Sequence, residues 1–185
     1  MNPSRYQLLI AAIIVQVLIL SLEYLNSVYP LWIGQKITLA VRPVDPRSLF
    51  RGNYARLNYD IERLDRGLYK DNAFQKAKRG SVIYVSLEKQ EDVWVPKTVQ
   101  PDKPTKELFI RGRVRGNHPS NQTTVQYGIE AYFAPPEKAK AVERDLRQAQ
   151  RGHDIDTSLA VAEVMVAPNG KAALLRVKTA GVKEE

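Results

Sequence analysis

The sequence predicts an N-terminal transmembrane helix plus an α+β domain, in which a mostly antiparallel β sheet or barrel of about eight strands carries one long helix. An apolar run near the N-terminus predicts the transmembrane helix. From Lys36 onward, apolar and polar residues alternate with a period of two, which is typical of half-buried strands. The 185 residues are 44% apolar and 26% charged, a composition that favours a globular protein over a disordered one.

The apolar run lies between Arg5 and Glu23, and only three of its 17 residues are polar: Gln7, Gln16 and Ser21. As a helix it rises about 25 Å, and extension through Leu25 brings it close to the roughly 30 Å of a bilayer's hydrocarbon layer. It is apolar on all sides, whereas a core helix shows one apolar stripe. A cleaved signal peptide is the alternative, although Leu25-Asn26-Ser27 is a poor cleavage site.

The charges around this segment predict its orientation. Arg5 and the terminal amine precede the span and Glu23 follows it, which places the N-terminus in the cytoplasm. We therefore expect a single-pass protein of the cytoplasmic (inner) membrane, with a cytoplasmic tip and anchor over residues 1–25, a juxtamembrane linker over 26–35 and a periplasmic, extracytoplasmic β-rich domain over 36–185. Residues 1–25 hold one Arg and one Glu, so residues 26–185 carry the whole net charge of +8 and are attracted to anionic headgroups.

Alternation predicts the strands of the domain at 36–42, 54–61, 81–88, 93–99, 108–116, 123–133, 159–167 and 172–178. Pro96 places its strand at a sheet edge, and Pro168-Asn169-Gly170 predicts a hairpin turn. An apolar stripe from Ala139 to Ala149, with Pro136 in the first turn, predicts the long helix. A shorter helix is predicted over 71–77, with Asp71 as its N-cap.

The composition excludes several kinds of site. The chain has no cysteine and only two histidines, His118 and His153, both in loop-like surroundings. A disulfide scaffold, a thiolate or histidine-rich metal site and a cysteine nucleophile are therefore excluded. No cofactor is expected, and composition points to no particular chemistry.

The loop between the first two strands has two interpretations. Asp45 followed by Pro46 suits the start of one helical turn, and Gly52 suits its left-handed end. In the structural interpretation, Asp45 satisfies backbone amides. In the functional interpretation, Arg47 and Arg51 bind a ligand or partner.

This region also carries a resemblance. Gly52-Asn53-Tyr54-Ala55-Arg56-Leu57-Asn58-Tyr59, preceded by Val44-Asp45-Pro46-Arg47, resembles the signature of the GDYXXLXY-motif family, and Tyr127-Gly128-Ile129-Glu130-Ala131-Tyr132-Phe133 is similar to its second block. The aspartate of the motif is Asn53 here, which suits a structural turn better than acid–base chemistry. The resemblance implies a membrane-anchored protein without an established activity. It also implies an accessory role, because such proteins are often encoded beside multi-pass membrane proteins.

A basic stripe is predicted in the hairpin around residues 117–122. Its register places Arg115 opposite Thr124, Arg113 opposite Gln126, Arg111 opposite Gly128 and Phe109 opposite Glu130, all on one face. Glu130 then lies diagonally across from Arg111, within reach of an ion pair. The stripe is either a solvated strand face, with an ion pair worth under about 1 kcal/mol, or a ridge that binds lipid phosphates, a polyanion or an acidic partner.

Two functions follow as hypotheses. The first is a non-enzymatic module that docks on a polytopic membrane protein or an anionic membrane surface. The second is a membrane-anchored hydrolase similar to signal peptidases, with Ser48 as nucleophile and Lys70 or Lys97 as base, although the serine block of that family is absent. No specific nucleic-acid partner is expected, because no aromatic stacking platform is evident.

Overall fold

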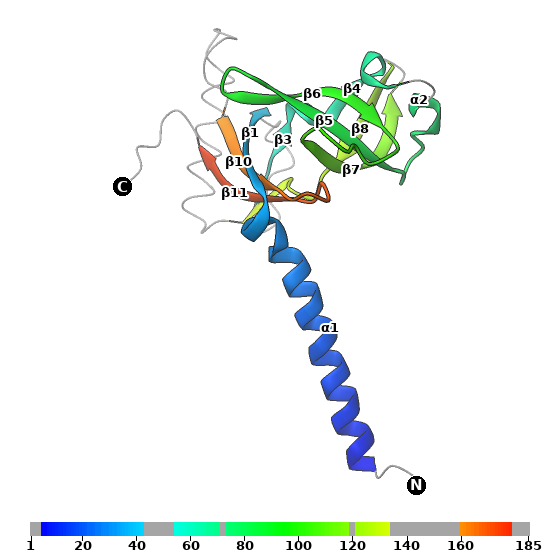
Figure 1. The fold of residues 1–185 in the computed structure, drawn as a ribbon, viewed down its shortest axis with the longest axis vertical. Helices are drawn as coiled ribbons and strands as arrows, with labels where there is room; N and C mark the ends of the chain where they lie inside the picture. The colour runs from blue at the N-terminus through cyan, green and yellow to red at the C-terminus, as the bar shows by residue number, and fades with distance from the viewer. Residues whose placement is uncertain (1–4, 43–53, 71–72, 119–120, 134–159, 179–185) are drawn as a thin grey trace.

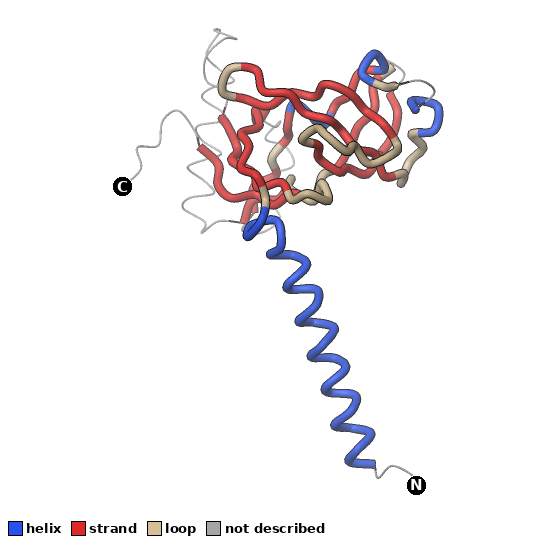
Figure 2. Tube along the Cα trace, viewed as in Figure 1, coloured by secondary structure: helices blue, strands red, loops and turns tan. Residues whose placement is uncertain are grey.

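The computed structural model describes residues 5–42, 54–70, 73–118, 121–133 and 160–178. One long helix projects from a β-rich domain (Figure 1). Strands make up most of the described part of that domain (Figure 2). The described helical elements are α1 (Arg5–Ile33), η2 (Asp60–Glu62), η3 (Arg66–Leu68) and α2 (Ala73–Lys76). The described strands are β1 (Gln35–Arg42), β2 (Tyr54–Arg56), β3 (Asn58–Tyr59), β4 (Arg63–Asp65), β5 (Val82–Gln90), β6 (Val93–Gln100), β7 (Phe109–His118), β8 (Gln122–Gln126), β9 (Ala131–Phe133), β10 (Ala160–Val166) and β11 (Ala172–Lys178).

Helix α1 is apolar around its whole circumference and long enough to cross a membrane. Its 29 residues rise about 43 Å. The stretch Tyr6–Ile33 has a mean hydropathy of 2.4 in its most apolar window, and none of that window is buried against the domain. The helix is longer than predicted, because most of the expected linker over residues 26–35 is helical and ends only at Ile33.

The junction between α1 and the domain is short and well packed. Gly34 is the one residue between α1 and β1, and its N–H donates to the Pro30 carbonyl at 2.9 Å. Pro30 has no N–H to offer the Asn26 carbonyl one turn earlier. The Lys171 ammonium donates to that carbonyl instead, at 2.6 Å. A Cβ added to Gly34 would lie 2.2 Å from the Pro30 oxygen and 3.0 Å from the Val166 nitrogen, so β10 approaches the helix end closely.

The described strands form three sheets, and neighbouring strands in each are antiparallel. Their orders are β11-β10-β1-β3, β2-β9 and β4-β8-β7-β5-β6. Strand β6, which carries Pro96, lies at the edge of the third sheet as predicted. The predicted hairpin turn joins β10 to β11, where Gly170 has a φ of +79° and donates its N–H to the Ala167 carbonyl.

Two predicted strands are each divided in two, and β4 was not predicted. The 54–61 strand is interrupted at Leu57, whose N–H donates outside the sheet ladder to the Glu130 carbonyl. The 123–133 strand breaks around Gly128, where a φ of +85° turns the chain. Alternation alone did not reveal these breaks. Val125, Tyr127 and Ile129 stay buried through the second one, and only at Ala131, which is exposed, does the pattern change. The long helix predicted from Pro136 to Ala149 and the Asp71 cap lie outside the described residues.

The core follows the predicted alternation. Ile37, Leu39 and Val41 of β1 are buried, and so are Leu57, Tyr59 and Ile61 in and beside β3. Other members of the same cluster come from the third sheet and from β10: Leu64, Ile83, Val85, Val99, Ile110, Val114, Val125, Ala162 and Val164. One apolar core therefore joins the two larger sheets.

Candidate functional site

The two sequence blocks that carry the family resemblance meet inside the domain. The Tyr59 hydroxyl donates to the Ile129 carbonyl at 2.8 Å, and the Tyr127 hydroxyl donates to the Ile61 carbonyl at 2.7 Å. Tyr59 of the first block thus donates to the backbone of the second block, and Tyr127 of the second donates to the backbone two residues beyond the first. Since both tyrosines are buried, these bonds fasten together segments almost 70 residues apart.

Two buried carboxylates hold the turns on either side of this contact. Glu62 accepts the Tyr59 N–H at 3.0 Å. Glu130 accepts the N–H groups of Tyr127 and Gly128. The predicted ion pair between Glu130 and Arg111 is wrong, because the turn at Gly128 points the carboxylate back to its own backbone.

Burial raises the pKa of the Tyr59 hydroxyl, and the nearby Glu130 and Glu62 carboxylates raise it further. Burial is also the main reason why the pKa of Tyr127 is raised. Both hydroxyls therefore keep their protons and act as hydrogen-bond donors. The geometry of the two blocks is that of a structural clamp.

The structure separates the motif residues into three groups. Leu57 and Tyr59 are core residues. Tyr54 lies in β2, paired with Phe133 of β9. The other motif candidates lie outside the described residues, so both interpretations of their loop stay predictions: Asp45, Pro46, Arg47, Arg51, Gly52 and Asn53.

The basic stripe is only partly as predicted. Arg111, Arg113 and Arg115 of β7 are all exposed. Arg113 pairs with Gln126 as expected, but a bulge lets Gly116 pair with Thr124, so the predicted Arg115–Thr124 pair is wrong.

The predicted register also fails at the other end of β7. Strand β8 ends at Gln126, so its pairing with β7 does not reach Gly128 or Glu130. Phe109 shares the face of Arg111 and Arg113, as predicted, because β7 pairs with β5 in a regular register from Phe109 to Arg113. Unlike the arginines, it is buried there. A Cβ on Gly170 would lie 2.6 Å from the Phe109 ring, which shows that the β10–β11 turn covers it.

The arginines border a surface groove of about 450 Å³ that the sequence did not predict. Arg111 and Arg113 lie on one side, and Lys171 of the β10–β11 turn lies on the other. Among the described residues, no acidic side chain lines this groove. Sequence reasoning missed Lys171 because it is 60 positions from Arg111 and only the tertiary fold brings them together.

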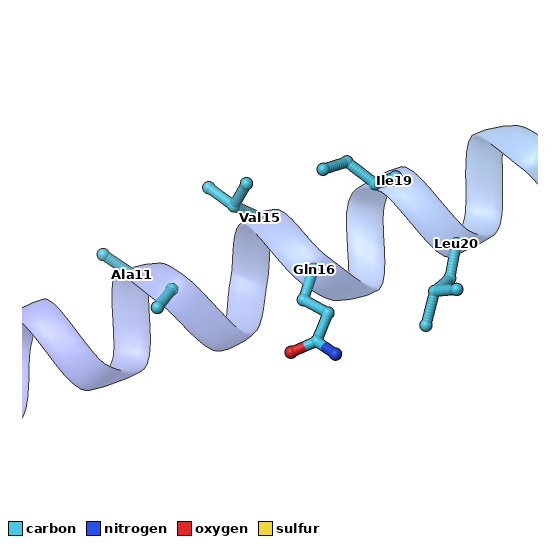
Figure 3. Close-up of a pocket in the computed structure, with 6 residues that line it drawn as sticks. Ala11, Val15, Gln16, Ile19 and Leu20 are labelled. Atoms are coloured by element: carbon cyan, nitrogen blue, oxygen red, sulfur yellow. The ribbon is translucent and has the colours of Figure 1, made fainter.

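A second, shallow groove of about 460 Å³ runs along α1 and is lined by Ala11, Ala12, Val15, Gln16, Ile19 and Leu20. Figure 3 shows Gln16 projecting from the helix with its amide at the tip, while Val15 and Ile19 extend from another side. Gln16 is the polar side chain in this apolar set.

The structure places neither lysine of the hydrolase hypothesis where a base needs to be. A lysine acts as a base when burial removes its charge. Lys97 instead pairs with Glu107 at 3.3 Å and has a 47% exposed side chain, and Lys70 is exposed. Ser48 lies outside the described residues. Among the residues that the structure describes, no three His, Asp or Glu side chains gather to hold a metal ion.

Together these features define a β-rich protein with an apolar N-terminal helix long enough to span a membrane. The chain belongs to the family described as GDYXXLXY protein, which matches residues 16–177. This match confirms the resemblance and includes both clamp blocks. No curated protein and no solved structure matches the chain.

Proposed function

We propose that this protein is a single-pass, extracytoplasmic accessory module of the cytoplasmic membrane, without catalytic activity, that docks on a polytopic membrane protein. The observation that carries this proposal is an exposed apolar helix with a glutamine amide near its middle, separated from the first strand of a folded domain by Gly34 alone. A helix of this kind suits lateral association in the bilayer, and a directly attached domain suits a fixed position above the partner.

The junction supports a retained anchor over a cleaved signal peptide. The alternative cleavage site, Leu25-Asn26-Ser27, lies inside α1. The Asn26 carbonyl also holds the Lys171 ammonium, so cleavage there would remove a contact of the folded domain. Protein segments that are cut readily are exposed loops with few such contacts.

Gln16 supports docking through the helix. A span from Tyr6 to Leu25 measures about 30 Å, which is the thickness of the hydrocarbon layer. Gln16 then lies near the bilayer midplane, where water cannot satisfy its amide. A hydrogen bond to another transmembrane helix is worth about 1–2 kcal/mol in peptide systems, and Ala12 one turn away permits close approach. We propose a multi-pass membrane protein as the partner of α1, because the family resemblance implies an accessory role beside such proteins.

The first prediction concerns topology. The chain contains no natural cysteine, so single cysteines report their own surroundings. With a membrane-impermeant maleimide on intact spheroplasts, Lys106→Cys in the domain is expected to be labelled and Asn2→Cys is not. Both are expected to label after detergent lysis. Labelling of Asn2→Cys alone before lysis would contradict the orientation, and recovery of soluble Lys106→Cys protein lacking the helix would contradict the anchor.

The second prediction concerns the docking face of α1. A photo-crosslinking residue at Ala12, beside Gln16, is expected to form an adduct with a multi-pass membrane protein in native membranes. The same residue at Leu18, which the helical period places on the opposite face, serves as the control and is expected to give at most a tenth of that adduct. Gln16→Leu in the Ala12 background is expected to reduce the adduct at least threefold.

Three outcomes would contradict the docking proposal. Equal adducts from both positions would indicate random lipid-phase encounters. An adduct of twice the chain's mass would identify a second copy as the partner. Absence of any adduct, in membranes where the topology test succeeds, would leave the helix as an anchor alone.

A further inference from the structure

The groove lined by β7 and by residues beside the β10–β11 turn has the composition of an anion site. Its charged lining is wholly cationic: Arg111, Arg113 and Lys171. The remaining residues that line it are neutral, and among them Gly112 and Gly128 carry no side chain. Guanidinium and ammonium groups around a hollow free of carboxylates attract phosphate oxygens.

The three cations keep donors available for a ligand. The Arg111 side chain is exposed, and among the described residues none accepts a hydrogen bond from its guanidinium. Arg113 uses one nitrogen, Nη1, on the Gly80 carbonyl at 3.0 Å, which orients the group and leaves its other N–H donors available. Lys171 uses one of three ammonium protons on Asn26.

A chain of contacts connects this groove to the outer end of the membrane span. The Arg111 N–H donates to the Gly170 carbonyl at 2.7 Å, so β7 is bonded to the turn that carries Lys171. Lys171 in turn is bonded to the Asn26 carbonyl that Pro30 leaves without its helical partner. Figure 1 shows the β10–β11 turn on the side of the domain from which α1 projects.

These contacts determine the depth of the groove in a membrane. If Tyr6–Leu25 fills the hydrocarbon layer, Asn26 is the first residue beyond it and lies among the headgroups. An ammonium that touches the Asn26 carbonyl therefore lies at headgroup level too. Arg111 and Arg113 line the same groove as Lys171 and therefore lie beside the same layer.

We propose that this groove binds the phosphate of an anionic phospholipid headgroup in the outer leaflet. The inference rests on the proposed anchoring by α1, and it names lipid as a second ligand beside the protein partner. The phosphodiester is held between the arginines of β7 and Lys171, and its acyl chains run down beside α1. Binding fixes the domain against the bilayer and restricts its rotation about the span.

The test uses the full chain purified in a neutral detergent and titrated with short-chain phosphatidylglycerol, short-chain phosphatidylcholine or inorganic phosphate. Calorimetry at low salt is expected to show saturable binding of phosphatidylglycerol, at least tenfold tighter than either of the other two. One cation near an anionic headgroup contributes about fivefold in affinity. The triple variant Arg111→Gln/Arg113→Gln/Lys171→Gln is therefore expected to bind about a hundredfold more weakly.

A second triple variant is the matched control. Lys76→Gln/Lys106→Gln/Arg115→Gln removes the same charge from exposed positions outside the groove lining, and its affinity is expected to stay within threefold of the natural chain. Arg111→Gln alone, which removes no side-chain hydrogen bond or ion pair between described residues, is expected to weaken binding about fivefold with an unchanged melting temperature. This variant keeps the test valid if loss of Lys171 loosens the helix junction.

The outcomes separate this inference from the proposed docking function. Equal losses in the two triple variants would show diffuse charge attraction and overturn the site. Phosphate binding as tight as that of phosphatidylglycerol would show a free-phosphate site and overturn the lipid assignment. If phosphatidylglycerol, phosphatidylcholine and inorganic phosphate all fail to bind, both the anion site and its assignment to lipid are overturned. The adducts formed at Ala12 report docking of α1 whichever of these results is found.

Discussion

Tyr127→Phe is expected to lower the free energy of unfolding by about 2 kcal/mol, because it leaves a buried carbonyl without its hydrogen bond. The Tyr127 hydroxyl donates to the Ile61 carbonyl at 2.7 Å inside the core. The ring of phenylalanine fills the same space, so packing is retained. Tyr59→Phe removes the matching bond to the Ile129 carbonyl and is expected to cost a similar amount, about 2 kcal/mol.

The double variant tests whether the two bonds form one clamp. Both hydrogen bonds connect the same pair of segments, so loss of one weakens the other. We therefore expect the double variant to lose less unfolding free energy than the two single variants added together, by at least about 0.5 kcal/mol. Urea unfolding in neutral detergent measures these differences. Tyr84→Phe is the control, because the Tyr84 ring packs edge-on against Phe109, a contact that phenylalanine keeps, and no described residue bonds its hydroxyl. If Tyr127→Phe lowers the free energy of unfolding no more than Tyr84→Phe does, the clamp is contradicted.

Glu163→Gln is expected to lower the free energy of unfolding by about 2 kcal/mol at neutral pH, since three cations lose their shared carboxylate. Glu163 lies on the outer face of β10 with a side chain only 6% exposed. Arg176 binds it through its guanidinium, and Lys36 and Lys178 approach to 3.0 and 3.1 Å. The expected loss is below that of a fully buried pair because the cations are about half exposed and regain water.

The same cluster predicts a pH dependence. The Arg176 hydrogen bond is the largest cause that lowers the pKa of Glu163 from 4.5 to about 2, with burial opposing it and the two lysines adding to it. The folded state therefore prefers the ionised carboxyl more than the unfolded chain does. This stabilisation is complete above about pH 5 and is lost as the pH falls through 4.5 toward 2.

Thermal unfolding of the natural chain and of Glu163→Gln between pH 7 and 2 measures this pH dependence. The difference in melting temperature between the natural chain and Glu163→Gln is expected to shrink across the acidic range. Glu107→Gln serves as the control, because Glu107 and its partner Lys97 are 40% and 47% exposed, and it is expected to cost under about 1 kcal/mol. A difference at Glu163 that stays constant down to pH 2 would show that the carboxylate charge is not responsible.

Hydrophobic alternation and single residues such as proline predicted the secondary structure correctly wherever a residue's environment depends on its neighbours in sequence. The alternation of Ile37, Leu39 and Val41 predicted a half-buried strand, and Pro96 predicted a sheet edge. The predicted register of the β7–β8 hairpin is correct at Arg113 and Val114, which pair with Gln126 and Val125. Beyond these two pairs, a bulge at one end and the left-handed Gly128 at the other each shift the pairing, and such events depend on packing against other strands.

The candidate sites were less predictable than the strands. The sequence identified Arg111 and Arg113 as exposed cations, and the structure added Lys171 and the groove between them. Glu130 was assigned to the wrong partner, because charge and diagonal distance on an idealised sheet say nothing of the backbone amides of a nearby turn.

The amino-acid sequence by itself determined the apolar span, the strand-rich body and the family blocks, since these depend on composition and on periods of a few residues. Only the tertiary structure decided that the two blocks are a reciprocal clamp and that Lys171 completes a basic groove at the helix junction. The physical reason is that contacts between residues 60 or 70 positions apart depend on how sheets pack, whereas hydropathy and alternation record only which face of each element is buried.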